Sequence, residues 1–189
     1  MNFNNTTSRF GALSIGMHWL MLALLIAVYA CMELRGYWPR GSDLREGLKM
    51  WHFMLGLSVF ALVLLRLAIR LSGPTPLVQP ELPAWQRQLS RLVHASLYAF
   101  MLAMPILGWL TLSAETKPIP FFGLQLPALI GPDKAFAHSV QDLHETIGTI
   151  GYYLIGLHAA AALFHHYVMH DNTLLRMLPR WAHRTDKPA

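Results

Sequence analysis

The sequence is short of charge and of cysteine. Charged side chains make up only 13% of its 189 residues, while 54% of the residues are hydrophobic; ordinary soluble domains carry about 25% charged residues. This balance is typical of an integral membrane protein and argues against a large soluble core. The single cysteine, Cys31, excludes an intrachain disulfide and a thiolate cluster. A Rossmann glycine pattern, a P-loop and a Gly-x-Ser-x-Gly motif are also missing.

Acidic and basic residues are absent from four long stretches. These stretches are 10–32, 50–65, 92–114 and 146–170. A bilayer core of ~30 Å requires about 20 helical residues, so each stretch predicts a transmembrane helix. The second stretch is short, but the stems of Arg66 and Arg70 can extend its helix to the interface. We therefore expect an all-α integral membrane four-helix bundle, a single domain over 1–189, with helices at about 10–34, 47–70, 88–114 and 139–170.

Basic residues are distributed unequally over the two ends of these helices. With four spans, nine of the 15 Lys and Arg residues fall on the side of the termini and the loop 66–91, including Arg180, Arg184 and Lys187. The positive-inside rule then predicts that both the N-terminus and the C-terminus are cytoplasmic. This topology accounts for the net charge of +5, so we expect no nucleic-acid partner.

Two loops are long enough to have a predictable character. Four prolines, at 74, 76, 80 and 83, predict an extended, non-helical chain over 71–90. The outer loop, 115–137, also contains prolines but is rich in Phe and Leu. We expect this loop to lie as a lid on the outer end of the bundle.

Five histidines lie in or near the expected helices, where ionisable groups are costly and usually functional. His18 and His94 fall near the cytoplasmic ends of the first and third helices, and His52 falls near the outer end of the second. The fourth helix carries His144 near its outer end and His158 fourteen residues further on. That spacing places the two on one face of the helix, ~21 Å apart along its axis.

Each histidine of the fourth helix has a potential partner at its own depth. His144 can pair with His52, and His158 can pair with either His18 or His94. Two inward-facing pairs at two depths match two b haems with two axial imidazoles each, a coordination that suits electron transfer rather than oxygen binding. Small residues allow a flat macrocycle to approach a helix, and glycines lie near the predicted ligands at 56, 148, 151 and 156.

Two other interpretations use the same histidines. A transmembrane histidine often only hydrogen-bonds to a neighbouring helix. A cation pathway, and hence a non-haem cation transporter, is the second alternative. Such a pathway usually brings Asp or Glu into the spans, whereas the acids here lie at the ends of the spans.

The remaining histidines are expected outside the haem-ligand positions. His165 lies near the face of His158 but ~10 Å further along the helix, so we expect it at the interface, near haem propionates or a quinone. His138 is expected in the outer loop. We place the others, His166, His170 and His183, at the cytoplasmic interface or in the tail.

Two stretches, together with the His-x13-His spacing, resemble a known family. The stretches are MELRGYWPR at 32–40 and GYYLIGLHAAAALFHHYVMHDNTLLRMLPR at 151–180. Nearly the whole chain is similar to the bacterial four-helix cytochrome b561 proteins, which are related to the membrane cytochrome subunits of nickel-iron hydrogenases and formate dehydrogenases. The two stretches look like those of the branch that acts as superoxide oxidase.

The resemblance implies a di-haem oxidoreductase of the bacterial inner membrane. Such an enzyme passes electrons from periplasmic superoxide through two haem b groups to ubiquinone. The implied axial ligands are His18 and His158 for the inner haem, and His52 and His144 for the outer haem. His94 then becomes a candidate for the quinone pocket or for propionate contacts.

Superoxide is a small anion and requires a cationic outer pocket rather than an open iron site. The candidates for attracting it are Arg35, Arg40, Lys49 and Lys117. Arg45 and Lys134 lie on the same side and are equally well explained as solvated loop charges. The alternative function is a cytochrome b electron-transfer subunit of a partner dehydrogenase or hydrogenase. The short outer loop 33–49 and the lack of an appended domain favour a protein without an obligatory protein partner.

Overall fold

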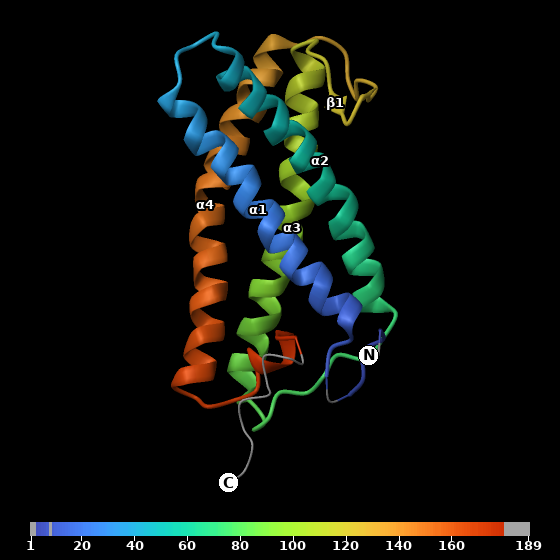
Figure 1. Ribbon diagram of the computed structural model, residues 1–189, viewed down its shortest axis with the longest axis vertical. Coiled ribbons are helices and arrows are strands. Elements are labelled where there is room, and N and C mark those ends of the chain that lie inside the picture. The colour runs from blue at the N-terminus through green and yellow to red at the C-terminus, as the bar shows by residue number, and fades with distance from the viewer. Residues whose placement is uncertain (1–2, 8, 180–189) are drawn as a thin grey trace. The chain divides into compact units, whose positions relative to one another are not determined.

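The computed structural model describes residues 3–7 and 9–179, and four long helices dominate it (Figure 1). Helix α1 spans Ala12–Leu34, α2 spans Asp43–Leu71, α3 spans Ala84–Ala114 and α4 spans Lys134–Tyr167. The short elements are the 3₁₀ turns η1 (Arg35–Tyr37) and η2 (Leu175–Met177) and the strands β1 (Pro120–Phe121) and β2 (Leu124–Gln125). The two strands pair antiparallel, so the chain is mostly helical with one small hairpin.

All four long helices have the length and composition needed to cross a membrane. Large apolar side chains such as Ile26, Leu64, Ile150 and Leu157 are exposed on them. Apolar patches of this kind promote aggregation in water, but lipid chains solvate them. The chain is therefore a multi-pass membrane protein, as its charge-poor stretches predict.

Helix α4 begins before the charge-poor stretch that predicts it. The Asp133 carboxylate accepts a hydrogen bond from the backbone N–H of Phe136 at 3.0 Å and caps the helix. His138, expected in the outer loop, therefore lies in the first turns of α4, and that expectation is wrong.

Helix α3 also begins earlier than expected, at Ala84. Pro83 is the last proline of the preceding loop, and its carbonyl accepts the backbone N–H of Arg87 at 3.1 Å. Proline is compatible with the start of a helix because the first backbone N–H groups have no intrahelical partner. The prediction of an extended chain over 71–90 is consequently wrong for 84–90.

The chain divides into two compact units, and each long helix contributes to both. The first unit contains the described residues up to Leu20, together with Leu65–Leu97 and 153–179. The second unit contains Met21–Leu64 and Tyr98–Tyr152. The tail residues assigned above to the cytoplasmic side, Arg180, His183, Arg184 and Lys187, lie outside the described residues.

The loop after α3 packs against helices of its own unit. Ile119 and Leu126 form an apolar cluster with Leu57 of α2 and Leu112 of α3. The indole N–H of Trp109 donates to the Pro127 carbonyl at 3.0 Å. The loop is therefore held against α2 and α3, in keeping with its apolar composition.

Candidate functional site

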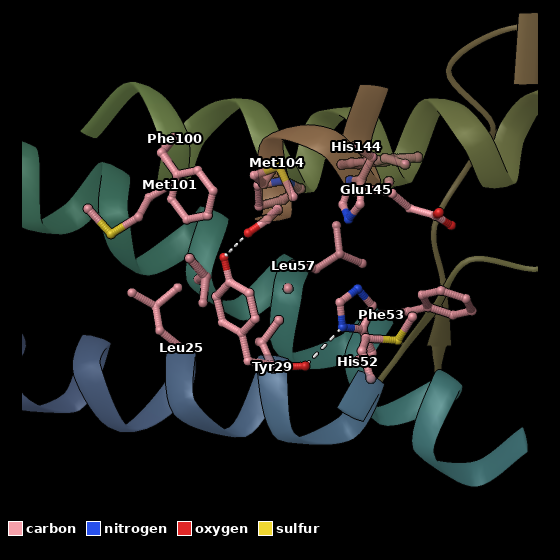
Figure 2. Close-up of a pocket in the computed structure, with 18 of the residues that line it drawn as sticks. Leu25, Tyr29, His52, Phe53, Leu57, Phe100, Met101, Met104, His144 and Glu145 are labelled. Atoms are coloured by element: carbon pink, nitrogen blue, oxygen red, sulfur yellow. Dashed lines mark hydrogen bonds between the residues drawn. The ribbon is translucent and has the colours of Figure 1, made fainter. Parts of the chain in front are cut away.

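The second unit encloses a cavity of about 320 Å³, within the range of ~300–1,000 Å³ usual for ligand pockets. Side chains of all four long helices line it, and most of them are apolar. His52 on α2 and His144 on α4 point toward one another across this space (Figure 2). The structure thus brings together the two histidines that share the outer depth in the sequence.

The separation of these two rings fits a haem iron between them. Their centroids are 6.1 Å apart. An imidazole nitrogen lies ~2 Å from a bound metal and about 1 Å from its own ring centre, so two axial rings on one iron have centroids roughly 6 Å apart. A zinc ion requires four ligands from its surroundings, whereas haem brings its own equatorial nitrogens and needs only axial ones.

Hydrogen bonding prepares His52 to act as such a ligand. Its Nδ1 lies 3.1 Å from the Val28 carbonyl, which can only accept a hydrogen bond, so Nδ1 carries the proton and Nε2 has the free lone pair. On the opposite side, Nδ1 of His144 is buried and, among the described residues, has no hydrogen bond of normal geometry. The residues of this cavity therefore fit a bis-histidine haem.

Several glycines line the cavity and leave space in it, but some of the glycines singled out from the sequence do not. Gly56, Gly108 and Gly148 line it, and a Cβ at Gly56 would meet no heavy atom within 4 Å. Gly151 instead admits aromatic side chains: a Cβ there would lie 2.6 Å from Cζ of Phe100 and closer still to the Tyr29 hydroxyl. The expectation that Gly151 makes room for haem is therefore wrong, because protein atoms occupy that space.

We expect Gly151→Ala to destabilise the protein by about 1–3 kcal/mol through overpacking. The new methyl group displaces Tyr29, whose hydroxyl donates to the Gly148 carbonyl at 2.8 Å. Thermal unfolding followed by the haem absorbance measures the effect. Gly47→Ala is the matched control, since a Cβ there meets nothing within 4 Å and the residue does not line the cavity. Adding Tyr29→Phe should restore part of the lost stability, and an unchanged midpoint for Gly151→Ala would contradict this packing.

The polar side of the cavity contains groups that sequence reasoning missed. These are Glu33 and Tyr152, which line it beside the predicted Arg35. The Tyr152 hydroxyl donates to Oε1 of Glu33 at 2.6 Å, and its ring centroid lies 4.3 Å from that of Tyr29. Tyr29, Glu33 and Tyr152 lie in or beside charge-poor stretches, and that was the available signal in the sequence. Only the structure shows that these three side chains are in contact.

Of the four cations predicted to attract superoxide, one lies in the wall of the cavity. Arg35 lines it, whereas Arg40 lies exposed on the turn before α2. Lys49 and Lys117 also lie outside the cavity, and each forms an ion pair, with Glu46 at 2.7 Å and Glu115 at 2.8 Å respectively.

Arg45, which the sequence explains equally well as a superoxide-attracting cation or as a solvated loop charge, hydrogen-bonds to the backbone before α2. Its Nη1 donates to the carbonyls of Arg35 and Trp38 at 2.8 and 2.9 Å. Arg45 thereby holds the η1 turn on which Arg35 approaches the cavity.

The first unit brings together the three histidines of the inner depth. The ring centroid of His158 lies 6.2 Å from that of His18 and 5.3 Å from that of His94. The longer separation nearly equals that of His52 and His144, which favours His18 as the partner across an iron. Nη2 of Arg66 lies 3.1 Å from Nδ1 of His18. Because arginine can only donate, Nδ1 of His18 accepts in this contact, and the contact would have to change if Nε2 were to hold the iron.

His94 and His165 have different neighbours. Nδ1 of His94 lies 2.6 Å from the Ser90 carbonyl of its own helix. Nδ1 of His165 lies 2.5 Å from Oδ2 of Asp171, a buried carboxylate. Asp171 is not among the residues singled out from the sequence, where its six-residue separation from His165 was the only signal of a contact.

Comparisons with known proteins identify the family of the chain. The family model described as prokaryotic cytochrome b561 matches residues 9–180. Cytochrome b561 homolog 1 of Escherichia coli K12 is 39% identical over 92% of this chain and 98% of its own length. The probable superoxide oxidase CybB of Yersinia pestis is 37% identical over 91% of this chain and 97% of its own. Cytochrome b561 homolog 2 of E. coli K12 is 30% identical over 94% and 95%.

Proposed function

Because the chain belongs to the prokaryotic cytochrome b561 family, a family of electron-transfer proteins that bind b-type haem, we propose that it is a superoxide:ubiquinone oxidoreductase with two haems. The observation that carries this proposal is the pair of matched histidine separations, 6.1 Å in the second unit and 6.2 Å in the first. The similarity to a relative named probable superoxide oxidase supports the choice of donor.

The proposed ligands are His52 and His144 for one haem and His18 and His158 for the other. Bound there, haem b would supply one-electron chemistry, and two histidine ligands for each haem would suit electron transfer rather than oxygen binding. The protein orients the ligands: the Val28 carbonyl fixes the tautomer of His52.

Arg35 is proposed to attract the anionic donor. It lines the cavity that holds His52 and His144, and Arg45 fixes its turn. A cation beside a low-dielectric pocket concentrates small anions and raises their rate of association. The positive-inside count supports placing this end at the periplasmic face, with both termini in the cytoplasm.

Superoxide-driven haem reduction is the test of this function. The absorbance spectrum of the purified protein is recorded during enzymatic superoxide generation, with superoxide dismutase as the control. We expect rapid haem reduction that dismutase abolishes, followed by reoxidation when ubiquinone is added. Haem bands that dithionite reduces and superoxide does not would overturn the proposed donor and favour a protein partner.

Arg35→Gln should slow haem reduction by superoxide about 3- to 10-fold at low ionic strength, because it removes the cation that lines the cavity. The difference should shrink as salt is added, since screening shortens the reach of charge. Arg87→Gln is the control: the same charge is removed from a solvent-exposed pair with Glu81, in the first unit. Equal rates for the Arg35 and Arg87 variants at low salt would contradict the steering role.

A further inference from the structure

Glu33 places a carboxylate in the wall of the cavity, at the exposed end of α1. Its Oε1 accepts a hydrogen bond from the Tyr152 hydroxyl at 2.6 Å. The Tyr152 ring lies against that of Tyr29, with centroids 4.3 Å apart, and the Tyr29 hydroxyl donates to the Gly148 carbonyl. The carboxylate is therefore held in position, and its Oε2 accepts no hydrogen bond from the residues that the structure describes.

The carboxylate shares the cavity wall with a cation but does not pair with it. Arg35 follows two residues after Glu33 and lines the same cavity. Within the described part of the chain, Glu33 forms no ion pair with Arg35 or with any other cation. Two opposite charges thus line one cavity separately. The guanidinium can only donate hydrogen bonds, and the carboxylate can only accept them.

A fixed negative charge is unfavourable for the anion that Arg35 is proposed to attract. Superoxide has no proton to donate, so the Glu33 carboxylate repels it and gains no hydrogen bond from it. The conjugate acid of superoxide, the hydroperoxyl radical, is neutral and carries one O–H group. That group can donate to Oε2 of Glu33, so the carboxylate favours the neutral acid over the anion.

We propose that Glu33 is the general base for the hydroperoxyl radical, so that the site oxidises the neutral form of the donor as well as the anion. This inference rests on the proposed function, in which superoxide gives its electron to the cytochrome. Oxidation of hydroperoxyl yields molecular oxygen, one electron and one proton. The O–H bond breaks, the proton goes to Oε2 of Glu33, the electron goes to the cytochrome, and oxygen leaves. Because Glu33 is exposed, water then takes the proton from it.

Tyr152 is the positioning residue of this base. Its hydroxyl occupies Oε1 of Glu33, which leaves Oε2 as the acceptor. Tyr152 and the proposed haem ligand His144 lie on the same helix, α4. The hydrogen bond from Tyr152 therefore fixes the base relative to that ligand. A positioned general base contributes roughly 10²- to 10⁴-fold to the rate of a step that breaks a bond to hydrogen.

Glu33→Gln tests the base, because its amide oxygen still accepts from Tyr152 but does not take up a proton. The full-length haem-loaded protein is mixed with enzymatically generated superoxide, and haem reduction is followed by absorbance. At neutral pH, where the anion predominates, the variant should be about 2- to 3-fold faster than the native protein, because a repelling charge is gone. At an acidic pH where both forms of the donor are abundant, it should be about 3-fold slower or more, because hydroperoxyl has lost its base.

The reversal between the two pH values separates a base from a structural residue. Each rate is divided by that of the native protein at the same pH, which cancels the pH dependence of the superoxide source. A change at the haem would alter both ratios in one direction, and haem content and midpoint potential are measured in parallel. The other titratable or charged groups that line the cavity, all unchanged in Glu33→Gln, are Tyr29 on α1, Arg35 on η1, His52 on α2, and His144, Glu145 and Tyr152 on α4.

Three further variants support the comparison. Asp43→Asn is the matched control, since it removes one negative charge from an exposed residue of the same unit that does not line the cavity. This variant should show no reversal. Glu33→Asp keeps a carboxylate and should lie between the native protein and Glu33→Gln at acidic pH. Tyr152→Phe leaves Glu33 in place without its hydrogen bond and should also be slower at acidic pH, so the result does not depend on one variant folding.

The outcomes distinguish this inference from the function on which it rests. Native protein that superoxide reduces, with a ratio of Glu33→Gln to native that is the same at both pH values, overturns the base alone. Native protein that is reduced at neither pH overturns the superoxide donor and the base together. A ratio above one at neutral pH and below one at acidic pH supports both.

Discussion

Replacement of His52 with leucine is expected to remove one haem and leave the other bound. Leucine offers no nitrogen to iron, so His144 would be left as the single axial ligand in a site built for two. His144→Leu should have the same result for the same reason. Haem content per protein, measured as the pyridine haemochrome, should fall by about half in each variant.

The reciprocal variants and a matched control make this result specific. His18→Leu and His158→Leu should remove the other haem, leaving a spectrum that complements that of the His52 variant. His138→Leu should retain the full haem content, because His138 is an exposed residue of α4 that faces Asp142. Full haem content in both the His52 and His144 variants would show that the ligand pair of the second unit is misassigned.

Gly56→Leu should exclude haem from the cavity while both ligands remain. Gly56 lies one turn after His52, lines the cavity, and has no heavy atom within 4 Å of the position that a Cβ would take. A leucine side chain would project into the volume that the macrocycle requires. An overpacking cost of ~1–3 kcal/mol corresponds to roughly 5- to 150-fold weaker haem binding.

Haem titration of the apoprotein measures this loss of affinity. The control is Gly47→Leu, the same substitution on α2 at a position that does not line the cavity and where a Cβ also meets nothing within 4 Å. The control should bind both haems with native affinity. Native haem affinity in Gly56→Leu would mean that the macrocycle does not occupy the space beside this residue.

The four transmembrane helices could be predicted from the sequence, and their starts could not. The hydrocarbon core excludes charge over a fixed thickness, so a run without acids and bases is enough to indicate a span. The start of α4 depends on a single capping hydrogen bond that the Asp133 carboxylate accepts. The start of α3 depends on the position of Pro83, the last proline of the preceding loop. A charged first turn looks the same as a loop in a composition profile.

The depth of each histidine in the membrane could also be predicted from the sequence, because a helix advances a constant distance per residue. Depth alone left His158 with two potential partners. The choice between His18 and His94 depends on interhelical distances, 6.2 Å against 5.3 Å between ring centroids. The resemblance to the family implies His18, and the ring spacing supports the same pairing on physical grounds.

The hydrophobicity of a helix and the depth of a residue along it depend on that helix alone, so both can be predicted from the linear sequence. The filling of the space at Gly151 by Tyr29 and Phe100, and the support of the η1 turn by Arg45, are contacts between residues far apart or in different elements. The pairing of His165 with buried Asp171 likewise requires the chain to turn back after α4. Contacts of this kind depend on which side chains meet in three dimensions, so the fold determines them and residue order does not display them.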